Sequence, residues 1–266
     1  GRKHELKYTP VKECALKHNI PVFQPEKVRK ETDEILKYNP DIIITCAYGQ
    51  IIPSVLLDTP KYKAVNVHAS LLPKLRGGSP LHRCIIDGYS ETGVTIMYMA
   101  PGMDDGDIIT QKSIKIEDTD NVGTIHDKLS ILGRDLLLET LPSIFNGTNG
   151  RTRQDENEVT FAYNIKREEE KLDFNEKARE VFNHIRGMYP FPVSYTTLNG
   201  EIIKICESKI GTKTSGTVGE IISIYDNGIG VKCSDTEIII TKLKPSGKKE
   251  MMARDFINGR GKDKLL

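Results

Sequence analysis

The chain has 266 residues, 38% of them hydrophobic and 6% aromatic, with a formal net charge of +1 at pH 7. This length allows one large domain or two ordinary ones with a real core, and the composition excludes global disorder and a polycation that coats nucleic acid. The apolar runs are too short to span a membrane and the first residues are polar and basic, so we expect a cytoplasmic protein without a membrane segment.

The first half of the chain alternates helical and strand patterns. Helices are predicted over residues 11–18 and 27–38, with a short strand over 21–24. The β-branched run at 41–48 is typical of a strand buried on both faces. Strands over 64–68 and 93–99, an extended segment over 107–116, and helices over 81–86 and 122–145 follow. This pattern predicts an α/β domain, residues 1–147, with a mostly parallel, Rossmann-like sheet covered by helices.

The second half changes to β-type runs. A polar, aperiodic stretch after residue 146 predicts the end of the first domain and a linker over 148–168. A helix over 176–187 precedes five strand-like runs between 193 and 242, separated by turn signals such as Asn199-Gly200. We therefore expect a C-terminal domain, residues 169–266, built as a small OB-like β-barrel.

The cysteines and the charged residues further limit the kinds of site that the chain can contain. The five cysteines are scattered singly without metal-ligand spacing, so we expect reduced, buried thiols and no metal site. Residues 242–264 carry eight basic and three acidic side chains, a local net charge of +5. That asymmetry permits contact with a polyanion, and a solvated surface explains it equally well.

The densest cluster of reactive side chains follows two predicted strands. Asn66 and His68 share one face near the end of the 64–68 strand, and Asp104 lies in the turn after the 93–99 strand. If the two strands are parallel neighbours, the three side chains meet at one sheet edge. An amide and an imidazole can stabilise an oxyanion while a carboxylate assists proton removal, as acyl transfer to an amine requires. A purely structural histidine beside an ordinary Asp-Gly turn remains the alternative.

The string SLLPKLRGGSP, preceded by NVHA and followed by ETGVTIMYMAPGMDDGDII, resembles the signature of the folate-dependent formyltransferases. The opening GRKHELKYTPVK, the stretch TFAYNIKREEEKLDF and the late LKPSGKKEMMARDFINGR resemble the branch whose acceptor is methionyl-tRNA. Members of that branch begin with a strand, a turn and a helix that do not precede Gly1, so the first strand of the sheet is expected to be missing and the first domain N-terminally incomplete.

The resemblance assigns roles to particular residues. It implies a catalytic trio of Asn66, His68 and Asp104, and a loop that receives the pterin part of 10-formyltetrahydrofolate, made of Ser70, Leu71, Leu72 and Pro73. It implies a formyl transfer to initiator methionyl-tRNA that supports translation initiation. We expect the protein to be a monomer. The residues expected to contact the tRNA are basic, namely Arg2, Lys3, Lys7, Lys248 and Lys249.

Two other functions remain open from the sequence. A 10-formyltetrahydrofolate hydrolase would share the trio but use water as the acceptor. A non-catalytic RNA-binding protein would use only the OB-like half, although residues 193–242 offer few aromatic side chains for base stacking, mainly Tyr195 and Tyr225. The basic opening and the late SGKK favour the tRNA-directed transferase.

Overall fold

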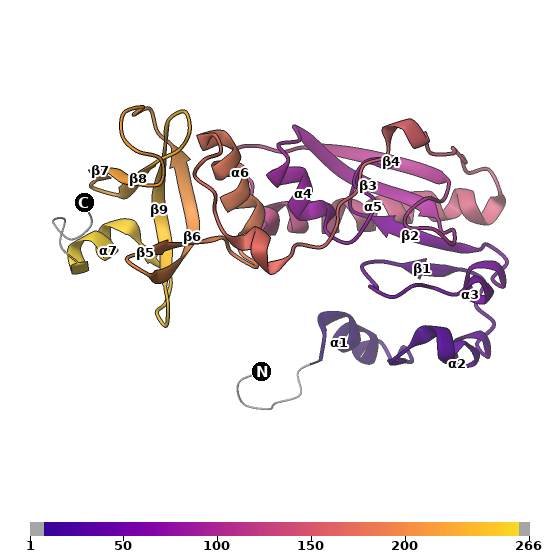
Figure 1. Ribbon diagram of the computed structural model, residues 1–266. Helices are drawn as coiled ribbons and strands as arrows, with labels where there is room; N and C mark the ends of the chain where they lie inside the picture. The colour runs from indigo at the N-terminus through magenta and orange to yellow at the C-terminus, as the bar shows by residue number, and fades with distance from the viewer. Residues whose placement is uncertain (1–7, 261–266) are drawn as a thin grey trace.

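The computed structural model describes residues 8–260 and contains two β-sheets joined by helices along an elongated molecule (Figure 1). The N-terminal sheet has the order β1-β2-β3-β4, and its strands are β1 (Ile43–Thr45), β2 (Ala64–His68), β3 (Glu91–Tyr98) and β4 (Ile108–Lys115). The α/β character of this half is confirmed.

The expectation of a mostly parallel sheet is wrong for the described strands. Only β1 and β2 are parallel, while β2 with β3 and β3 with β4 are antiparallel. Residues 99–107, which connect β3 to β4, are too few for a crossover, so the two strands form a hairpin. The β1 strand pairs only with β2 among the described residues, and its Ile44 is 42% exposed, so the prediction of burial on both faces is also wrong.

Of the helices in this half, a long one packs against β2, β3 and β4, and a short one contacts β2. The short helices are α1 (Pro10–Lys17), η1 (Val28–Lys30), α2 (Thr32–Leu36), α3 (Ser54–Asp58) and α4 (Pro80–Ile86). The predicted 27–38 helix is split, because Glu31 leaves the helical region at φ −126°. Residues 21–24 form no strand. The long helix α5 (Val122–Asn146) begins with a capping box at Asn121 and covers β3 with a stripe of aliphatic side chains.

The C-terminal half is a separate antiparallel sheet, ordered β5-β6-β9-β8-β7 with β10 against β9. Its strands are β5 (Tyr195–Leu198), β6 (Glu201–Ile210), β7 (Ile221–Tyr225), β8 (Gly228–Lys232), β9 (Glu237–Pro245) and β10 (Met251–Met252). The five predicted runs are thus strands. Within residues 8–260 no pairing joins β5 to β7, so the OB-like barrel stays a prediction.

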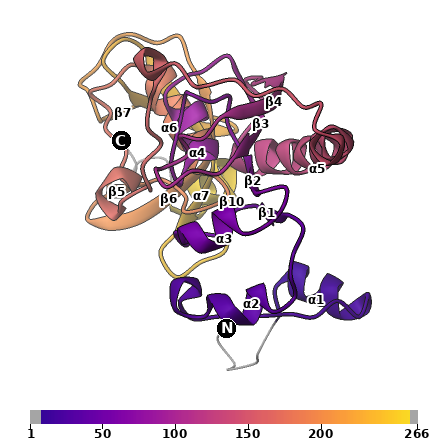
Figure 2. The ribbon, with the colours of Figure 1, turned by 90° about the vertical axis from the view of Figure 1, so that its right-hand side faces the viewer.

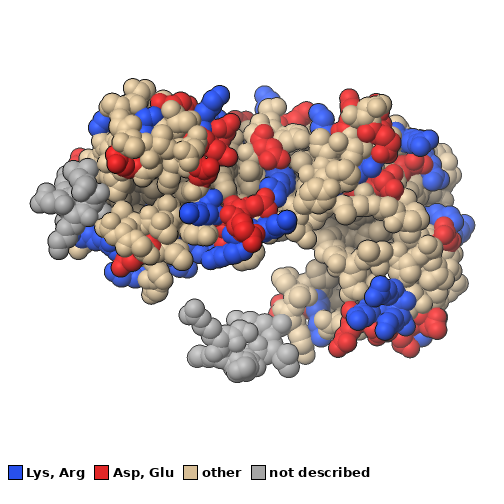
Figure 3. Space-filling view, in the orientation of Figure 1, with Lys and Arg blue, Asp and Glu red and all other residues tan. Residues whose placement is uncertain are grey.

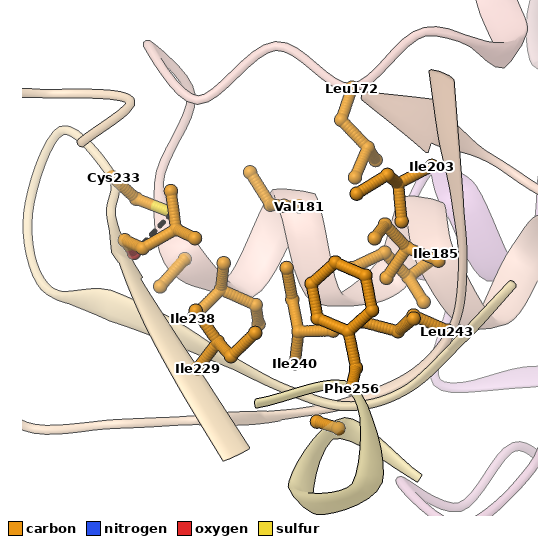
Figure 4. Packing of buried hydrophobic residues seen from close by; sticks show 14 of the residues in the cluster. Leu172, Val181, Ile185, Ile203, Ile229, Cys233, Ile238, Ile240, Leu243 and Phe256 are labelled. Atoms are coloured by element: carbon orange, nitrogen blue, oxygen red, sulfur yellow. Dashed lines mark hydrogen bonds between the residues drawn. The ribbon is translucent and has the colours of Figure 1, made fainter. Parts of the chain in front are cut away.

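The core of this half lies between the sheet and two helices, α6 (Ala178–Met188) and α7 (Ala253–Arg260). Figure 4 shows Val181 and Ile185 of α6 facing Ile240 and Leu243 of β9, with Phe256 of α7 closing the cluster. The α7 helix was not predicted, because its short sequence ARDFINGR mixes polar and apolar residues within a region of net basic charge. Its three buried positions are Ala253, Phe256 and Ile257.

Two segments connect the halves. The α6 helix packs closely on α4, since a Cβ on Gly187 would come within 2.5 Å of Ile86 Cγ1. The expected linker, residues 148–168, runs back along the first sheet: Thr152 bridges Ile108, and Phe161 bridges Arg76. It also contains the short helix η2 (Glu156–Glu158) and ends inside a second one, η3 (Arg167–Glu170). This stretch is therefore held to the N-terminal half by backbone hydrogen bonds.

The thiols only partly match the expectation. Cys84, Cys206 and Cys233 are buried, whereas Cys14 and Cys46 are exposed, so burial of all five is wrong. Cys14 lies in α1, which buries no residue, and Cys46 directly follows β1. None of the helices within residues 8–260 combines the length and apolarity needed to cross a membrane.

Candidate active site

The structure brings Asn66, His68 and Asp104 together. Asn66 and His68 project from the same face of β2, two residues apart, and Asp104 approaches them from the loop after β3. His68 Nδ1 lies 3.7 Å from Asp104 Oδ2, and Asn66 Nδ2 lies 3.5 Å from Asp104 Oδ1. His68 is 6% exposed while Asn66 and Asp104 are half-buried, so the cluster has one accessible side.

The route to this convergence differs from the predicted one. The strands β2 and β3 are antiparallel, with Val65 opposite Tyr98 and His68 opposite Thr95. The carboxyl ends of these two strands therefore point to opposite ends of the sheet. Asp104 reaches β2 because the 99–107 loop turns back over the sheet, with Asp104 itself at φ +49°. That left-handed conformation is uncommon for a residue with a side chain and must be held by its neighbours.

The hydrogen bonds of His68 define its protonated nitrogen. Its Nε2 lies 3.1 Å from the carbonyl oxygen of Leu75, which can only accept, so Nε2 carries a hydrogen. In the neutral ring, Nδ1 is therefore the unprotonated nitrogen, and it faces the carboxylate of Asp104. A proton taken up by Nδ1 would create an imidazolium within ion-pair distance of the Asp104 carboxylate.

Thr45, which the sequence did not single out, orients Asn66. The Thr45 hydroxyl is buried in β1 and donates to Asn66 Oδ1 over 3.0 Å. Since a carboxylate only accepts, Asn66 must turn its Nδ2 toward Asp104, and the oxygen of the amide then faces Thr45. The neighbouring Cys46 has an exposed surface, but the protein atoms around its thiol partly desolvate it and raise its pKa, which disfavours the thiolate.

A backbone amide fixes Asp104 from the other side. Gly77 N donates to Asp104 Oδ2 over 2.9 Å. Gly77 has φ +120°, and a Cβ there would lie 2.8 Å from the carbonyl oxygen of Ala162, so only glycine fits. The Arg-Gly-Gly sequence that resembles the family signature thus contributes directly to the geometry of the carboxylate.

The predicted folate loop is ordered by its own hydrogen bonds. Ser70 is fully buried and its hydroxyl donates to the Lys74 carbonyl over 2.7 Å, while the Leu72 amide donates to Thr95 Oγ1 over 3.1 Å. Leu72 is only 3% exposed, so both side chains face inward. Leu71 and Pro73 are half-exposed and line a cavity of about 150 Å³ whose lining does not include the trio.

Cavity size alone does not locate the reaction. A larger hollow of about 620 Å³ lies in the C-terminal half, and its lining residues are Tyr225, Asp226, Asn227, Met252 and Arg254. It contains none of the three converging side chains. In the part of the chain that is described, no group of three or more His, Cys, Asp or Glu side chains could hold a metal ion.

The predicted tRNA contacts are only partly visible. Arg2, Lys3 and Lys7 lie outside the described residues. Lys248 and Lys249 are exposed in the turn between β9 and β10. Both ribbon views place this turn on the same underside as α1 (Figure 1, Figure 2), and Figure 3 shows further basic side chains along the lower side of the C-terminal half.

Two family patterns cover most of the chain. The formyl transferase family pattern matches residues 1–141, and that of the formyl transferase C-terminal domain matches residues 164–261. The chain belongs to the formyl transferase family. The resemblance inferred from its motifs is thereby confirmed.

Its relatives place it more narrowly. It is 50% identical over 263 residues to the methionyl-tRNA formyltransferase of Bacillus subtilis. The aligned region covers 97% of this chain and 83% of that protein. It is 49% identical over 262 residues to the methionyl-tRNA formyltransferase of Staphylococcus epidermidis, covering 97% and 84%. Within the family, this chain is therefore similar to the methionyl-tRNA formyltransferases.

Solved structures support the fold alone. The sugar 3N-formyl transferase WlaRD superposes with a TM-score of 0.67 at 21% identity, covering 90% of this chain and 82% of the other. HypX from Aquifex aeolicus, solved with tetrahydrofolic acid, superposes with a TM-score of 0.65 at 18% identity, covering 85% of this chain and 40% of the other.

Proposed function

We propose that this chain transfers a formyl group from 10-formyltetrahydrofolate to the free amino group of initiator methionyl-tRNA and so supports translation initiation. The observation that carries this proposal is the convergence of an amide, an imidazole and a carboxylate at one accessible site formed by Asn66, His68 and Asp104. The similarity to methionyl-tRNA formyltransferases over nearly the whole chain supports the choice of acceptor.

Each side chain has a separate task in this reaction. The folate supplies an activated formyl carbon. Asn66 Nδ2 has two hydrogens: one donates to Asp104, and the second donates to the formyl oxygen as negative charge develops there, while Thr45 holds the amide oxygen on the other side. His68 Nδ1 takes up the proton that the attacking amine loses, and Asp104 stabilises the resulting imidazolium. The same nitrogen returns the proton to the departing folate nitrogen, so the protons balance over one turnover.

The loop of Ser70, Leu71, Leu72 and Pro73 is the proposed wall of the folate site. Ser70 and Leu72 hold its shape from within, and Leu71 and Pro73 offer apolar surface against which a flat ring can pack. Replacing Leu71 with Arg should then raise the KM for the folate and leave the KM for methionyl-tRNA unchanged. Equal increases in both KM values would argue for a general loss of structure.

The basic residues Lys248 and Lys249, with Arg2, Lys3 and Lys7, are the proposed contacts to the tRNA backbone. Exposed lysines at a projecting turn can neutralise phosphates without reading bases. We also infer that residues 1–147 and 169–266, an OB-like domain, act as two domains connected by 148–168 in a cytoplasmic monomer. Sedimentation at several protein concentrations tests the monomer directly.

Substitution of the oxyanion donor tests the proposed chemistry. Asn66→Ala should lower kcat for formylation of methionyl-tRNA by about 10²- to 10³-fold, the usual cost of removing such a donor. The exposed Asn175→Ala removes an amide of the same kind in a surface turn and should leave kcat unchanged. Full activity in Asn66→Ala would remove the basis of the proposal.

A further inference from the structure

Gln154 joins the two loops that form the site, although it belongs to neither sheet. Its side chain is 4% exposed, and its Nε2 donates to the carbonyl oxygens of Asp104 and Gly106, each over 2.8 Å. Its Oε1 accepts from Arg76 Nε over 2.9 Å. Carbonyls only accept and a guanidinium only donates, so all three hydrogen bonds require one orientation of the amide.

Arg76 anchors the other end of this connection. It is 5% exposed, and its terminal nitrogen lies 3.0 Å from Glu156, two residues beyond Gln154. Its backbone also pairs with the same stretch, because Arg76 N donates to the Thr160 carbonyl and Ala162 N donates to the Arg76 carbonyl. The residue after Arg76 is Gly77, whose amide holds Asp104 Oδ2.

The loop that carries Asp104 needs this support. Asp104 has φ +49°, and a Cβ on Gly106 would lie only 1.8 Å from the Tyr98 carbonyl oxygen, so the loop doubles back against the end of β3. A backbone in this conformation persists only where its surroundings hold it. Gln154 supplies two hydrogen bonds to the carbonyls on either side of Asp105, which fix the loop directly at Asp104.

We propose that Gln154 is a positioning residue for formyl transfer: it holds the Asp104 carboxylate against His68 by tying the Asp104 loop to Arg76. The proposal rests on the function proposed above. It gives the 148–168 segment a part in catalysis, because that segment sets the distance between the imidazole that takes up the proton and the carboxylate that stabilises the imidazolium.

The substitution Gln154→Glu removes the hydrogen bonds that Gln154 donates and keeps the one that it accepts. The carboxylate keeps its acceptor for Arg76 but cannot donate to the Asp104 and Gly106 carbonyls, and it repels them. Misplacement by about 1 Å costs about 100-fold in rate, so we expect kcat to fall by about 10- to 100-fold with little change in either KM. Thr140→Val, which removes a buried hydroxyl from α5 far from the site, is the matched control for loss of stability.

Coupling to Asp104 distinguishes positioning from general damage. In an Asp104→Ala background, Gln154→Glu should produce no further loss of kcat, because the group that it positions is gone. The proposal would be overturned if Gln154→Glu lowered kcat by the same factor in the wild-type and the Asp104→Ala enzymes. It would also be overturned if Thr140→Val, with an equal decrease in its unfolding midpoint, lowered kcat as much as Gln154→Glu does. An Asp104→Ala enzyme with full activity would overturn it as well.

A spectroscopic readout separates this proposal from the proposed function. Nitrogen NMR of the imidazole rings reports the protonation of His68 Nδ1, and Gln154→Glu should shift that signal while leaving those of His126 and His184 in place. Absence of formylation by the wild type would defeat the proposed function. Normal formylation and an unchanged His68 signal in Gln154→Glu would defeat the positioning role alone.

Discussion

Deleting the Thr45 hydroxyl tests how the amide of Asn66 is oriented. Thr45→Val keeps the shape of a side chain that is 8% exposed and removes the 3.0 Å hydrogen bond to Asn66 Oδ1. Such a bond contributes about 0.5–1.5 kcal/mol net. If the whole of this is lost in the transition state, kcat falls by about 2- to 12-fold, since about 1.4 kcal/mol corresponds to a factor of ten. This is well below the loss expected for Asn66→Ala.

The assay is single-turnover formylation of methionyl-tRNA at saturating folate, with urea unfolding measured in parallel. Thr45→Ser keeps the hydroxyl and should retain close to full kcat, even if the missing methyl lowers stability. Equal kcat losses in Thr45→Val and Thr45→Ser would show that packing, and not the hydrogen bond, explains the effect. An unchanged kcat in Thr45→Val would refute the role of Thr45.

Two further predictions concern the surface and the junction of the two halves. Combined replacement of Lys248 and Lys249 by Ala should raise the KM for methionyl-tRNA. It should also reduce the slope of the logarithm of the tRNA binding constant against the logarithm of the salt concentration, by about 0.7–0.9 for each phosphate that is no longer neutralised. An unchanged slope would exclude both lysines as tRNA-binding residues. His82 belongs to α4 and His184 to α6, and burial lowers the pKa of both imidazoles. Among the described residues, His82 Nδ1 and His184 Nε2 have no hydrogen-bond partner. The unfolded chain therefore binds protons first as the pH falls below about 6.5, so the free energy of unfolding should drop between pH 7.5 and pH 5.5, and His184→Gln should flatten that drop in urea titrations.

Much of the fold follows from local sequence. The five strand-like runs after residue 192 are interrupted by turn residues such as Asn199-Gly200, where Asn199 adopts φ +49° and Gly200 φ +81° in the structure. The α5 helix was predictable because its aliphatic residues recur at helical spacing. Likewise, Asn66 and His68 could be placed on one face from the two-residue period of a strand alone.

What the sequence did not yield are features that depend on tertiary contacts. The direction of β3 relative to β2 is one example, because a strand pattern is the same in either direction. Thr45 looked like one more β-branched residue of a buried strand, and its hydroxyl gains meaning only beside Asn66. Gln154 lies in a polar stretch typical of a linker, and its role emerges only when that stretch is seen to bind the Asp104 loop.

The most direct test of the central claim is formyl transfer itself, measured with 10-formyltetrahydrofolate and methionyl-tRNA, and again with water as the only acceptor. The wild type should formylate the tRNA and consume little folate in its absence. His68→Gln, which can still donate to the Leu75 carbonyl, should fold normally and lose the transfer. Folate consumed equally without tRNA, or full transfer by His68→Gln, would contradict the account.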